Sequence, residues 1–483
     1  MSEENKGKSI MSGMFWRFAE RISAQGVSFV VSLILARILT THDFGVVAIL
    51  LIFIDVANVF VSSGFGAALV QKRKPTDEDY STIFFFNIAF SIMVYLVIFL
   101  SAPAIERFYA IDKLGFYLRL LALKLPISGV STTQYAYVQK NMLFKKFFFS
   151  TIIGTLVSAV AGIYLAREGF GPLALVFQYL INALIAAVVL WFSIKWKPKL
   201  FFSFKVLKPL FNYGWKILFS SVLHSIYINL RGLVIGKFYT PNDLAFYNQG
   251  YKVPYLFVNN VNVTVDSVLF PVMAKKQDDK IEMKEILRKS ITVSSIIIWP
   301  MMIGLLVVSK NLILLVLTEK WLPCLPFLWL GCIQGAFEPV QITNLQAIKS
   351  MGRSDLILIM EFIKKGFGIL LLILTLKHGV LAIALGGVVQ TVIATIINTY
   401  PNKKLLGYNY FQQISDLIPA IILSSIMGVI VWSMNYINIR LTILLLLQVV
   451  VGVIVYVLLV YVFQRETFNE IIFLVKGKKG VSV

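Results

Sequence analysis

Two sets of polar side chains, about two hundred residues apart, are the part of this sequence that could do chemistry. The first set is Arg17, Arg21, Gln25, Ser28 and Ser32, and the second is Lys216, Ser220, His224, Tyr227 and Arg231. Each set interrupts an apolar stretch and falls within about 80° of arc on a helix, so each forms one polar stripe. A cation at membrane depth costs roughly 2.5–3.5 kcal/mol. The stripes therefore predict a wet cavity that receives an anion.

The arginines of the first stripe suit a phosphate-like ligand. Arg17 and Arg21 lie one helical turn apart. A guanidinium stays charged and can donate two parallel hydrogen bonds, which suits a diphosphate. For Arg17, snorkelling to the membrane interface is the alternative. We expect the neighbouring Glu20 to neutralise part of the charge of Arg17 or Arg21.

The second stripe could pass an anionic headgroup along a helix. Lys216 lies near the start of the apolar stretch, Arg231 near its far end and His224 between them. A lone histidine is more often a hydrogen-bonded packing residue, so that alternative stays open for His224. The predicted substrate-binding set is Arg17, Arg21, Gln25, Lys216, His224 and Arg231.

Two carboxylates lie in the middle of other apolar stretches. Asp55 is followed by Asn58 and Ser62, and Glu338 is followed by Pro339. A carboxylate at this depth is either the counter-ion of a buried cation or a proton or sodium site. Asp55, Glu338 and Glu20 are therefore predicted to take part in ion pairs or in ion coupling.

The composition is that of an integral membrane protein. Of the 483 residues, 58% are hydrophobic and only 14% are charged, whereas soluble domains carry about 25% charged residues. The first ten residues lack the pattern of a cleaved signal peptide, so we expect the first helix to be retained. The spacing of two cysteines and three histidines indicates no metal cluster, and we expect no cofactor. If the segment between Cys324 and Cys332 is helical, they lie too far apart for a disulfide.

Apolar stretches of about 20 residues predict about fourteen transmembrane helices and an all-α polytopic fold. The expected spans are 14–38, 45–68, 81–103, 117–137, 147–167, 171–194, 210–236, 249–272, 290–309, 326–348, 356–376, 380–401, 415–434 and 441–464. The loops between them are short, so no separate catalytic domain is predicted.

The charge of the loops alternates along the chain. With a cytoplasmic N-terminus, about 27 of the 45 Lys and Arg residues fall in inside segments and about 8 in outside loops. The positive-inside rule then places both termini of this multi-pass membrane protein in the cytoplasm. We interpret the net charge of +21 as a signal of membrane topology, which anionic membrane lipid would reinforce. We do not interpret it as evidence for a surface that binds nucleic acid.

The two cationic stretches also align with each other. Trp16-Arg17 corresponds to Trp215-Lys216, and the segment 37–44 corresponds to 237–244. Six spans separate them, so the halves enter the membrane in the same direction, as in a parallel repeat. We expect six-helix lobes at 1–205 and 206–405, with two additional helices and a basic tail at 406–483.

The segments that carry this repeat resemble the bacterial O-antigen and exopolysaccharide flippases, the polysaccharide-transporter branch of a superfamily that also holds multidrug exporters. The resemblance lies in Gly13 to Arg17 and Ala36 to Gly45, and in Gly236-Lys237-Phe238, Tyr247 to Lys252 and Val268 to Pro271. It implies transport of undecaprenyl-diphosphate-linked oligosaccharides from the cytoplasmic to the periplasmic leaflet by alternating access. It also implies a location in the bacterial inner membrane and a role in polysaccharide or lipopolysaccharide biosynthesis, with other polysaccharide-assembly proteins as partners.

We therefore expect a flippase that makes or breaks no bond, because cations can hold an anion without catalysing a reaction. One alternative is a cation-coupled drug or metabolite exporter of the same superfamily, whose cavity would be acidic. The other is a membrane glycosyltransferase or polymerase.

Overall fold

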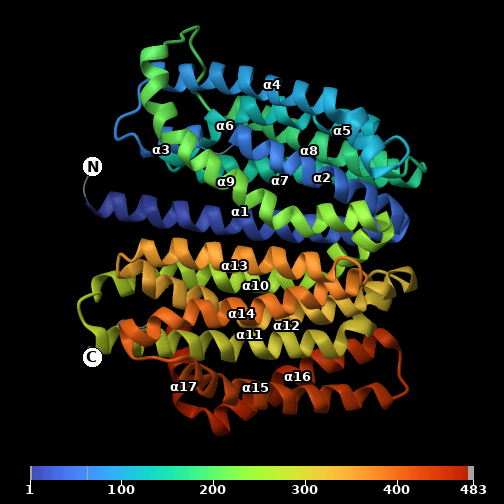
Figure 1. Ribbon diagram of the computed structural model, residues 1–483, viewed down its shortest axis with the longest axis vertical. Helices are drawn as coiled ribbons and strands as arrows, with labels where there is room; N and C mark the ends of the chain where they lie inside the picture. Colours follow the sequence, from blue (N-terminus) through green and yellow to red (C-terminus); the bar gives the residue numbers. More distant parts are fainter. Residues whose placement is uncertain (1–2, 63, 477–483) are drawn as a thin grey trace. The chain divides into compact units, whose positions relative to one another are not determined.

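The computed structural model describes residues 3–62 and 64–476, and helices make up nearly all of this range (Figure 1). The helices are α1 Glu3–Ile38, α2 Thr41–Ser62, α3 Phe65–Gln71, α4 Asp77–Tyr109, α5 Leu114–Leu121, α6 Lys124–Lys140, α7 Phe144–Arg167, α8 Pro172–Ser193, α9 Phe204–Phe238, α10 Pro241–Lys275, α11 Lys280–Val316, α12 Leu325–Ser350, α13 Ser354–Thr375, α14 Val380–Leu406, α15 Tyr410–Ser433, α16 Leu441–Phe463 and α17 Arg465–Lys476. Two 3-10 helices, η1 Glu319–Cys324 and η2 Met434–Tyr436, join longer helices. The predicted all-α class is confirmed.

Eleven stretches of the described chain are long and apolar enough to cross a membrane, which confirms a multi-pass membrane protein. The predicted spans 249–272, 326–348 and 356–376 fall on α10, α12 and α13, which are long but more polar. In α13, Glu361 forms ion pairs with Lys364 and Lys365, one turn farther along the helix. The count of fourteen spans remains a prediction.

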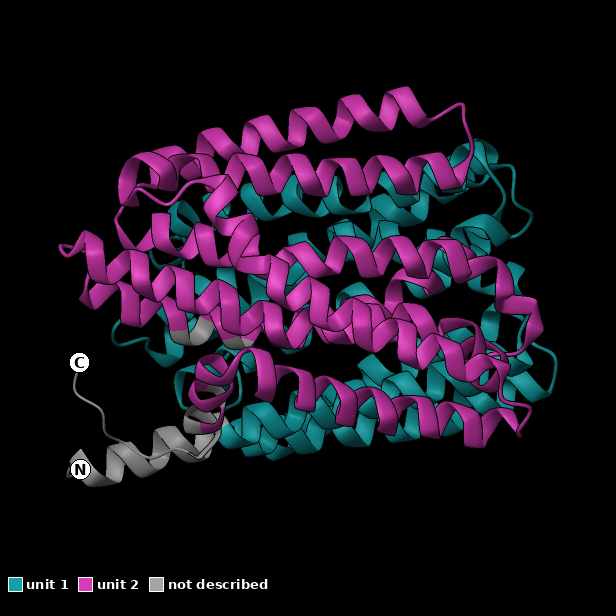
Figure 2. Cartoon of the chain, turned by 90° about the horizontal axis from the view of Figure 1, so that it is seen from below, with its two compact units in different colours: residues 1–245 teal, residues 246–483 magenta. Residues whose placement is uncertain are grey.

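The chain divides into two compact units, Met1–Ala245 and Phe246–Val483 (Figure 2). The first unit holds α1 to α9 and the start of α10. Helix α9 lies with this unit because it packs against α2, α3 and α4. The six-helix lobes at 1–205 and 206–405 were predicted from the sequence repeat, and they remain a prediction.

One end of the first unit collects the segments predicted to lie inside the cell. The Lys140 ammonium donates hydrogen bonds to the carbonyls of Val70 and Lys72, at 2.8 and 2.6 Å. Lys146 donates to the carbonyl of Ser193 at 2.6 Å. These contacts gather residues 70–72, 140–146 and 193 at one end, which we call the basic end of the first unit.

The predicted span 45–68 is broken at Gly64, at this basic end. Gly64 has a φ of 94°, in the region that favours glycine. A side chain at Gly64 would also collide with the carbonyl of Gly214 on α9. The break therefore lets the corner between α2 and α3 lie directly against α9.

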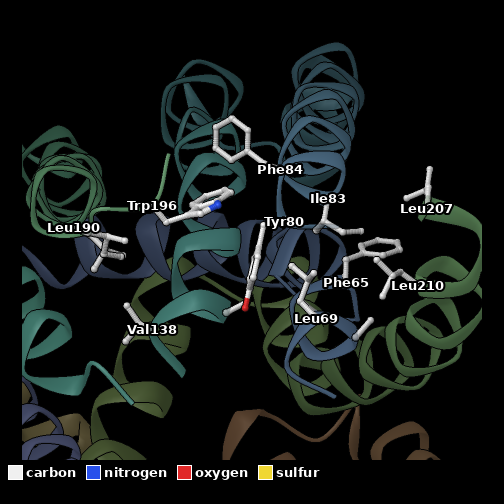
Figure 3. Packing of buried hydrophobic residues seen from close by; sticks show 13 residues of the cluster. Phe65, Leu69, Tyr80, Ile83, Phe84, Val138, Leu190, Trp196, Leu207 and Leu210 are labelled. Atoms are coloured by element: carbon white, nitrogen blue, oxygen red, sulfur yellow. The ribbon is translucent and has the colours of Figure 1, made fainter. Parts of the chain in front are cut away.

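An aromatic and aliphatic core fixes this corner (Figure 3). Phe65 and Leu69 of α3 pack with Tyr80 and Phe84 of α4 and with Trp196 after α8, all less than a tenth exposed. The same cluster includes Leu207 and Leu210 at the start of α9. Burial of these side chains joins α3, α4 and α9 beside the cavity described below.

The turns that follow the two cationic helices are equivalent. After α1, Thr40 and Asp43 form a capping box in which the backbone amide of Thr40 donates to the Asp43 carboxylate at 2.9 Å and the Asp43 amide donates to the Thr40 hydroxyl at 3.1 Å. After α9, Thr240 and Asp243 form the same pair of bonds at 3.0 and 3.2 Å. The two turns that the repeat aligns therefore have the same hydrogen bonding, while the repeat itself remains a prediction.

The second unit contains buried amide groups within its helices. The Asn344 amide donates to Gln413 at 2.8 Å, and Asn402 donates to the Asn344 side chain at 2.7 Å. These bonds tie α12, α14 and α15 together. At one end of the unit, Arg288 of α11 binds Asp416 of α15 through two hydrogen bonds of 2.8 and 2.7 Å.

Candidate functional site

A cavity of about 410 Å³ lies at the basic end of the first unit. Its walls come from α1, the α2–α3 corner, α6, the start of α7 and the first half of α9. The lining residues are Arg17, Ser62, Gly64, Gly66, Ala67, Thr132, Tyr135, Ala136, Val138, Gln139, Phe144, Phe147, Ile217 and Ser221. Both cationic helices therefore contribute to one cavity within this unit.

Arg17 is the cation in the cavity wall. Its guanidinium donates to the Glu20 carboxylate at 3.1 Å and lies over the ring of Phe147, 5.0 Å from the ring centre. The Arg17 side chain is still 50% exposed. It is thus held in place by a carboxylate and an aromatic face, and part of its surface remains open to a ligand.

Glu20 lies between two arginines. Its side chain is only 11% exposed, accepts a hydrogen bond from Thr151 and interacts electrostatically with both Arg17 and Arg21. Two guanidinium groups and one carboxylate leave this cluster with a net charge of +1. The expected neutralising contact of Glu20 is present, with Arg17 as its hydrogen-bonded partner.

The other predicted binding residues do not line this cavity. Arg21 is half-buried, and Gln25, Lys216 and His224 are exposed. Lys216 directly precedes Ile217, which is a wall residue. Arg231 lies four turns farther along α9, is half-buried and takes part in an interaction of its own. Their role in substrate binding remains a proposal.

The cavity has a polar surface that the sequence analysis missed. Thr132, Tyr135 and Gln139 come from α6, and Ser62 and Ser221 come from α2 and α9. The signal was present in the run 131–139, which is unusually polar for a membrane span. These side chains both donate and accept hydrogen bonds, as sugar hydroxyls do.

Asp55 lies deeper along α2 and belongs to a second polar cluster. Lys124 at the start of α6 is the cation that acts on Asp55. The same ammonium lies 5.9 Å from the ring centre of Tyr179 on α8. Nearby in sequence, the Asn58 side-chain oxygen is buried without a hydrogen-bond partner among the described residues. Lys124 is thus the nearby positive charge for Asp55, and the ion-pair role of Asp55 remains a prediction.

Glu338 lies in the second unit and is partly buried. Its carboxylate accepts a hydrogen bond of 2.8 Å from Asn262 of α10. One turn farther along α10, Asp266 accepts a hydrogen bond from the buried Gln346 of α12. Asn262, Asp266 and Gln346 were missed, although the amide-rich run 259–262 marks α10 as polar.

Some polar clusters outside the spans are structural. Tyr408, between α14 and α15, donates a hydrogen bond of 2.6 Å to Asp416. Burial, followed by this hydrogen bond, raises the pKa of the Tyr408 phenol above its ordinary value.

Cys324 and Cys332 are buried free thiols, in agreement with the spacing argument. No group of three His, Cys, Asp or Glu side chains able to hold a metal is found in the part of the chain that the structure describes.

The fold and the cavity define a class, namely multi-pass helical membrane proteins with a cavity lined by an arginine and by hydroxyl and amide groups. The lipid II flippase MurJ, in its inward closed conformation, has the same fold, with a TM-score of 0.76 at 17% identity over 94% of this chain and 99% of that chain.

Residues 34–326 match the family described as "Polysaccharide biosynthesis protein", and this stretch is more than half of the chain. The protein therefore belongs to that family. It is 24% identical over 436 residues to the teichuronic acid biosynthesis protein TuaB of Bacillus subtilis (strain 168), with 89% of each chain covered. It is 25% identical over 433 residues to the lipopolysaccharide biosynthesis protein WzxC of Escherichia coli (strain K12), covering 87% of this chain and 88% of the relative. The resemblance inferred from the sequence is confirmed.

Proposed function

We propose that this protein is a flippase that moves a polyprenyl-diphosphate-linked oligosaccharide from the cytoplasmic to the periplasmic leaflet by alternating access. The family and the relatives named for teichuronic acid and lipopolysaccharide biosynthesis support a polysaccharide precursor as the substrate. The likeness to a lipid II flippase supports a fold suited to movement of a lipid-linked sugar.

The observation that carries the proposal is the Arg17 cavity. The cluster of Arg17, Arg21 and Glu20 has a net charge of +1, and Arg17 is half exposed at the cavity wall. A diphosphate would bind there through charge-assisted hydrogen bonds. The hydroxyl and amide groups of Thr132, Tyr135 and Gln139 would contact the first sugars. A volume of about 410 Å³ is that of a small-molecule site.

The remaining parts of the substrate fit the surroundings. The polyprenyl tail, of the undecaprenyl type, would stay in the membrane lipid because it is entirely apolar. The lysine-rich basic end of the first unit would face the cytoplasm, where the positive-inside rule places such segments. Lys216 and Arg231 would then receive the diphosphate farther along α9. Polysaccharide-assembly proteins are the proposed partners that supply and consume the lipid-linked sugar.

A cell-based test compares three cations of the proposed binding path with an exposed arginine outside it. Arg17→Ala, Arg21→Ala and Lys216→Ala are introduced into cells that need the exported polymer, with Arg73→Ala at the same end as the control. Arg73 is exposed and lies outside the cavity lining. Loss of a charged hydrogen bond worth roughly 1.5–3 kcal/mol predicts a fall in export of about tenfold or more for Arg17→Ala. Normal export at normal protein levels in all three of these cation variants would overturn the proposal that Arg17, Arg21 and Lys216 bind the diphosphate.

A liposome assay separates the proposed function from its rivals. The purified protein is reconstituted with a fluorescent undecaprenyl-diphosphate-linked sugar in the outer leaflet or the inner leaflet. Translocation of the unaltered lipid supports the flippase. Sugar transfer or polymerisation would indicate an enzyme, and export of cationic drugs without movement of the sugar lipid would indicate a drug exporter.

A further inference from the structure

The second unit holds a carboxyl–amide pair at the middle of α12 that the proposed binding cavity does not use. Glu338 is thirteen residues from the start of α12 and twelve from its end, so it lies about 20 Å from the start at 1.5 Å per residue. Its one hydrogen-bonded side-chain partner in the described chain is the neutral amide of Asn262, at 2.8 Å. No ion pair of Glu338 is found among the described residues.

Asn262 can serve as a hydrogen-bond partner of Glu338 in either protonation state. The residue is 6% exposed, and its amide nitrogen donates to Glu338 while its amide oxygen has no partner in the described structure. A buried acceptor without a partner costs roughly 1–3 kcal/mol. If Glu338 gains a proton and the Asn262 amide rotates by half a turn, the carboxylic acid can donate to that oxygen. The amide can therefore pair with either state of the carboxyl group.

The surroundings favour a proton over a metal ion. Gly335, one turn before Glu338, packs closely against Val258 and the sulfur of Met302, and neither neighbour is a ligand for a hard cation. Pro339 has no amide hydrogen, so the carbonyl of Gly335 lacks its helical hydrogen bond. That carbonyl is an acceptor without its usual amide donor, one turn from the carboxyl group of Glu338.

Charged groups on the helices packed against α12 are engaged elsewhere or lie toward helix ends. On α10, Asp266 binds Gln346, while Lys252 lies nearly three turns from Asn262 and has an interaction of its own. On α13, Glu361 pairs with Lys364 and Lys365. The charged groups of α11 lie within Lys280 to Lys289 and at Lys310. Those of α14 are Lys403 and Lys404, in its last turn.

We propose that Glu338 and Asn262 form a proton-binding site that couples the transport cycle to the proton gradient. This inference rests on the proposed function, because it supplies the energy source for that movement. Protonation removes the charge of Glu338 and turns the Asn262 amide, so the contact between α10 and α12 changes with each proton that binds or leaves.

The first test asks whether Glu338 titrates, and it needs no substrate. Infrared difference spectra of the purified full-length protein are recorded through a pH titration, and the carboxylic acid carbonyl band is followed. Glu338→Gln keeps the shape of the side chain and can still pair with Asn262, so we expect it to fold and to lack one titrating band. Glu361→Gln is the matched control, since Glu361 is a carboxylate in a membrane helix with basic partners. A wild-type spectrum from which Glu338→Gln removes no band would overturn the proton site.

The second test asks whether the proton gradient drives movement of the sugar lipid. Proteoliposomes containing the fluorescent undecaprenyl-diphosphate-linked sugar are given a gradient of about one pH unit, which shifts the distribution of the lipid by about tenfold if one proton moves per cycle. We expect this shift in wild type and Glu361→Gln, and none in Glu338→Gln. An equal shift in Glu338→Gln would overturn the coupling role, whereas absence of any sugar-lipid movement in wild type would contradict the proposed function itself.

Discussion

Replacement of Glu20 by glutamine should strengthen anion binding at the Arg17 cavity and slow its release. Glutamine keeps a side-chain oxygen that can accept from Arg17 and from Thr151, the two groups that Glu20 contacts. The net charge of the Arg17, Arg21 and Glu20 cluster rises from +1 to +2.

The size of the effect follows from the geometry. If a phosphate accepts a hydrogen bond from the side of the Arg17 guanidinium opposite Glu20, two contacts of about 3 Å place it roughly 6 Å from the Glu20 carboxylate. At that distance two unit charges interact by about 0.7 kcal/mol in water and about 2.8 kcal/mol at an effective dielectric constant of 20. Because Arg17 is 50% exposed, we take about 1 kcal/mol, which corresponds to roughly fivefold tighter binding.

The assay uses undecaprenyl diphosphate as the probe and thermal stabilisation of the purified protein as the readout. Glu78→Gln is the control, because Glu78 is an exposed carboxylate at the same end of the unit. The gain for Glu20→Gln should shrink at high salt, which screens partly exposed charges. Unchanged or weaker binding in Glu20→Gln, with wild-type folding, would refute the placement of the anion beside Arg17.

Three further predictions concern the framework of the site. Gly64→Ala should lower the free energy of unfolding by about 1–3 kcal/mol because of the positive φ and the contact with α9, measured by thermal unfolding in detergent. Gly66→Ala, which meets only ordinary contacts, should have little effect. Thr240→Ala removes the cap of α10 and should cost about 1 kcal/mol in the same assay. Since the raised pKa of Tyr408 reflects a neutral phenol bound to Asp416, its contribution should be complete below about pH 10 and be lost as the pH rises further. Tyr408→Phe should reduce this alkaline loss of stability, and an unchanged profile would contradict the assignment.

The helical class and the alternation of loops could be predicted from the sequence because both follow from local composition. Apolar stretches of sufficient length form helices in a membrane, and the contacts of Lys140 and Lys146 bring the expected loops to one end of the first unit. The break at Gly64 could not be predicted, because a glycine in an apolar run does not reveal that a carbonyl of α9 lies against it.

The candidate site was predicted in part. Charge and spacing identified Arg17 and its neighbour Glu20, since both lie on the same turn of one helix. The cavity-lining residues of α6 could not be predicted, because they depend on which helices pack together and local sequence carries little information on helix packing. Asn262 was missed for the same reason, because an amide becomes informative only when its buried partner, here Glu338, is known.

The place of α9 in the first unit has a consequence for biogenesis. A growing chain inserts its helices in order, so α2, α3 and α4 are in the membrane before α9 leaves the ribosome. Helix α9 carries Lys216, His224 and Arg231, and none of the residues in its most apolar 18-residue stretch is buried. The earlier helices give it a surface to pack against at the moment of insertion. A second half synthesised alone from residue 206 would have to insert this helix without that surface, so its assembly depends on the first half having been made before it.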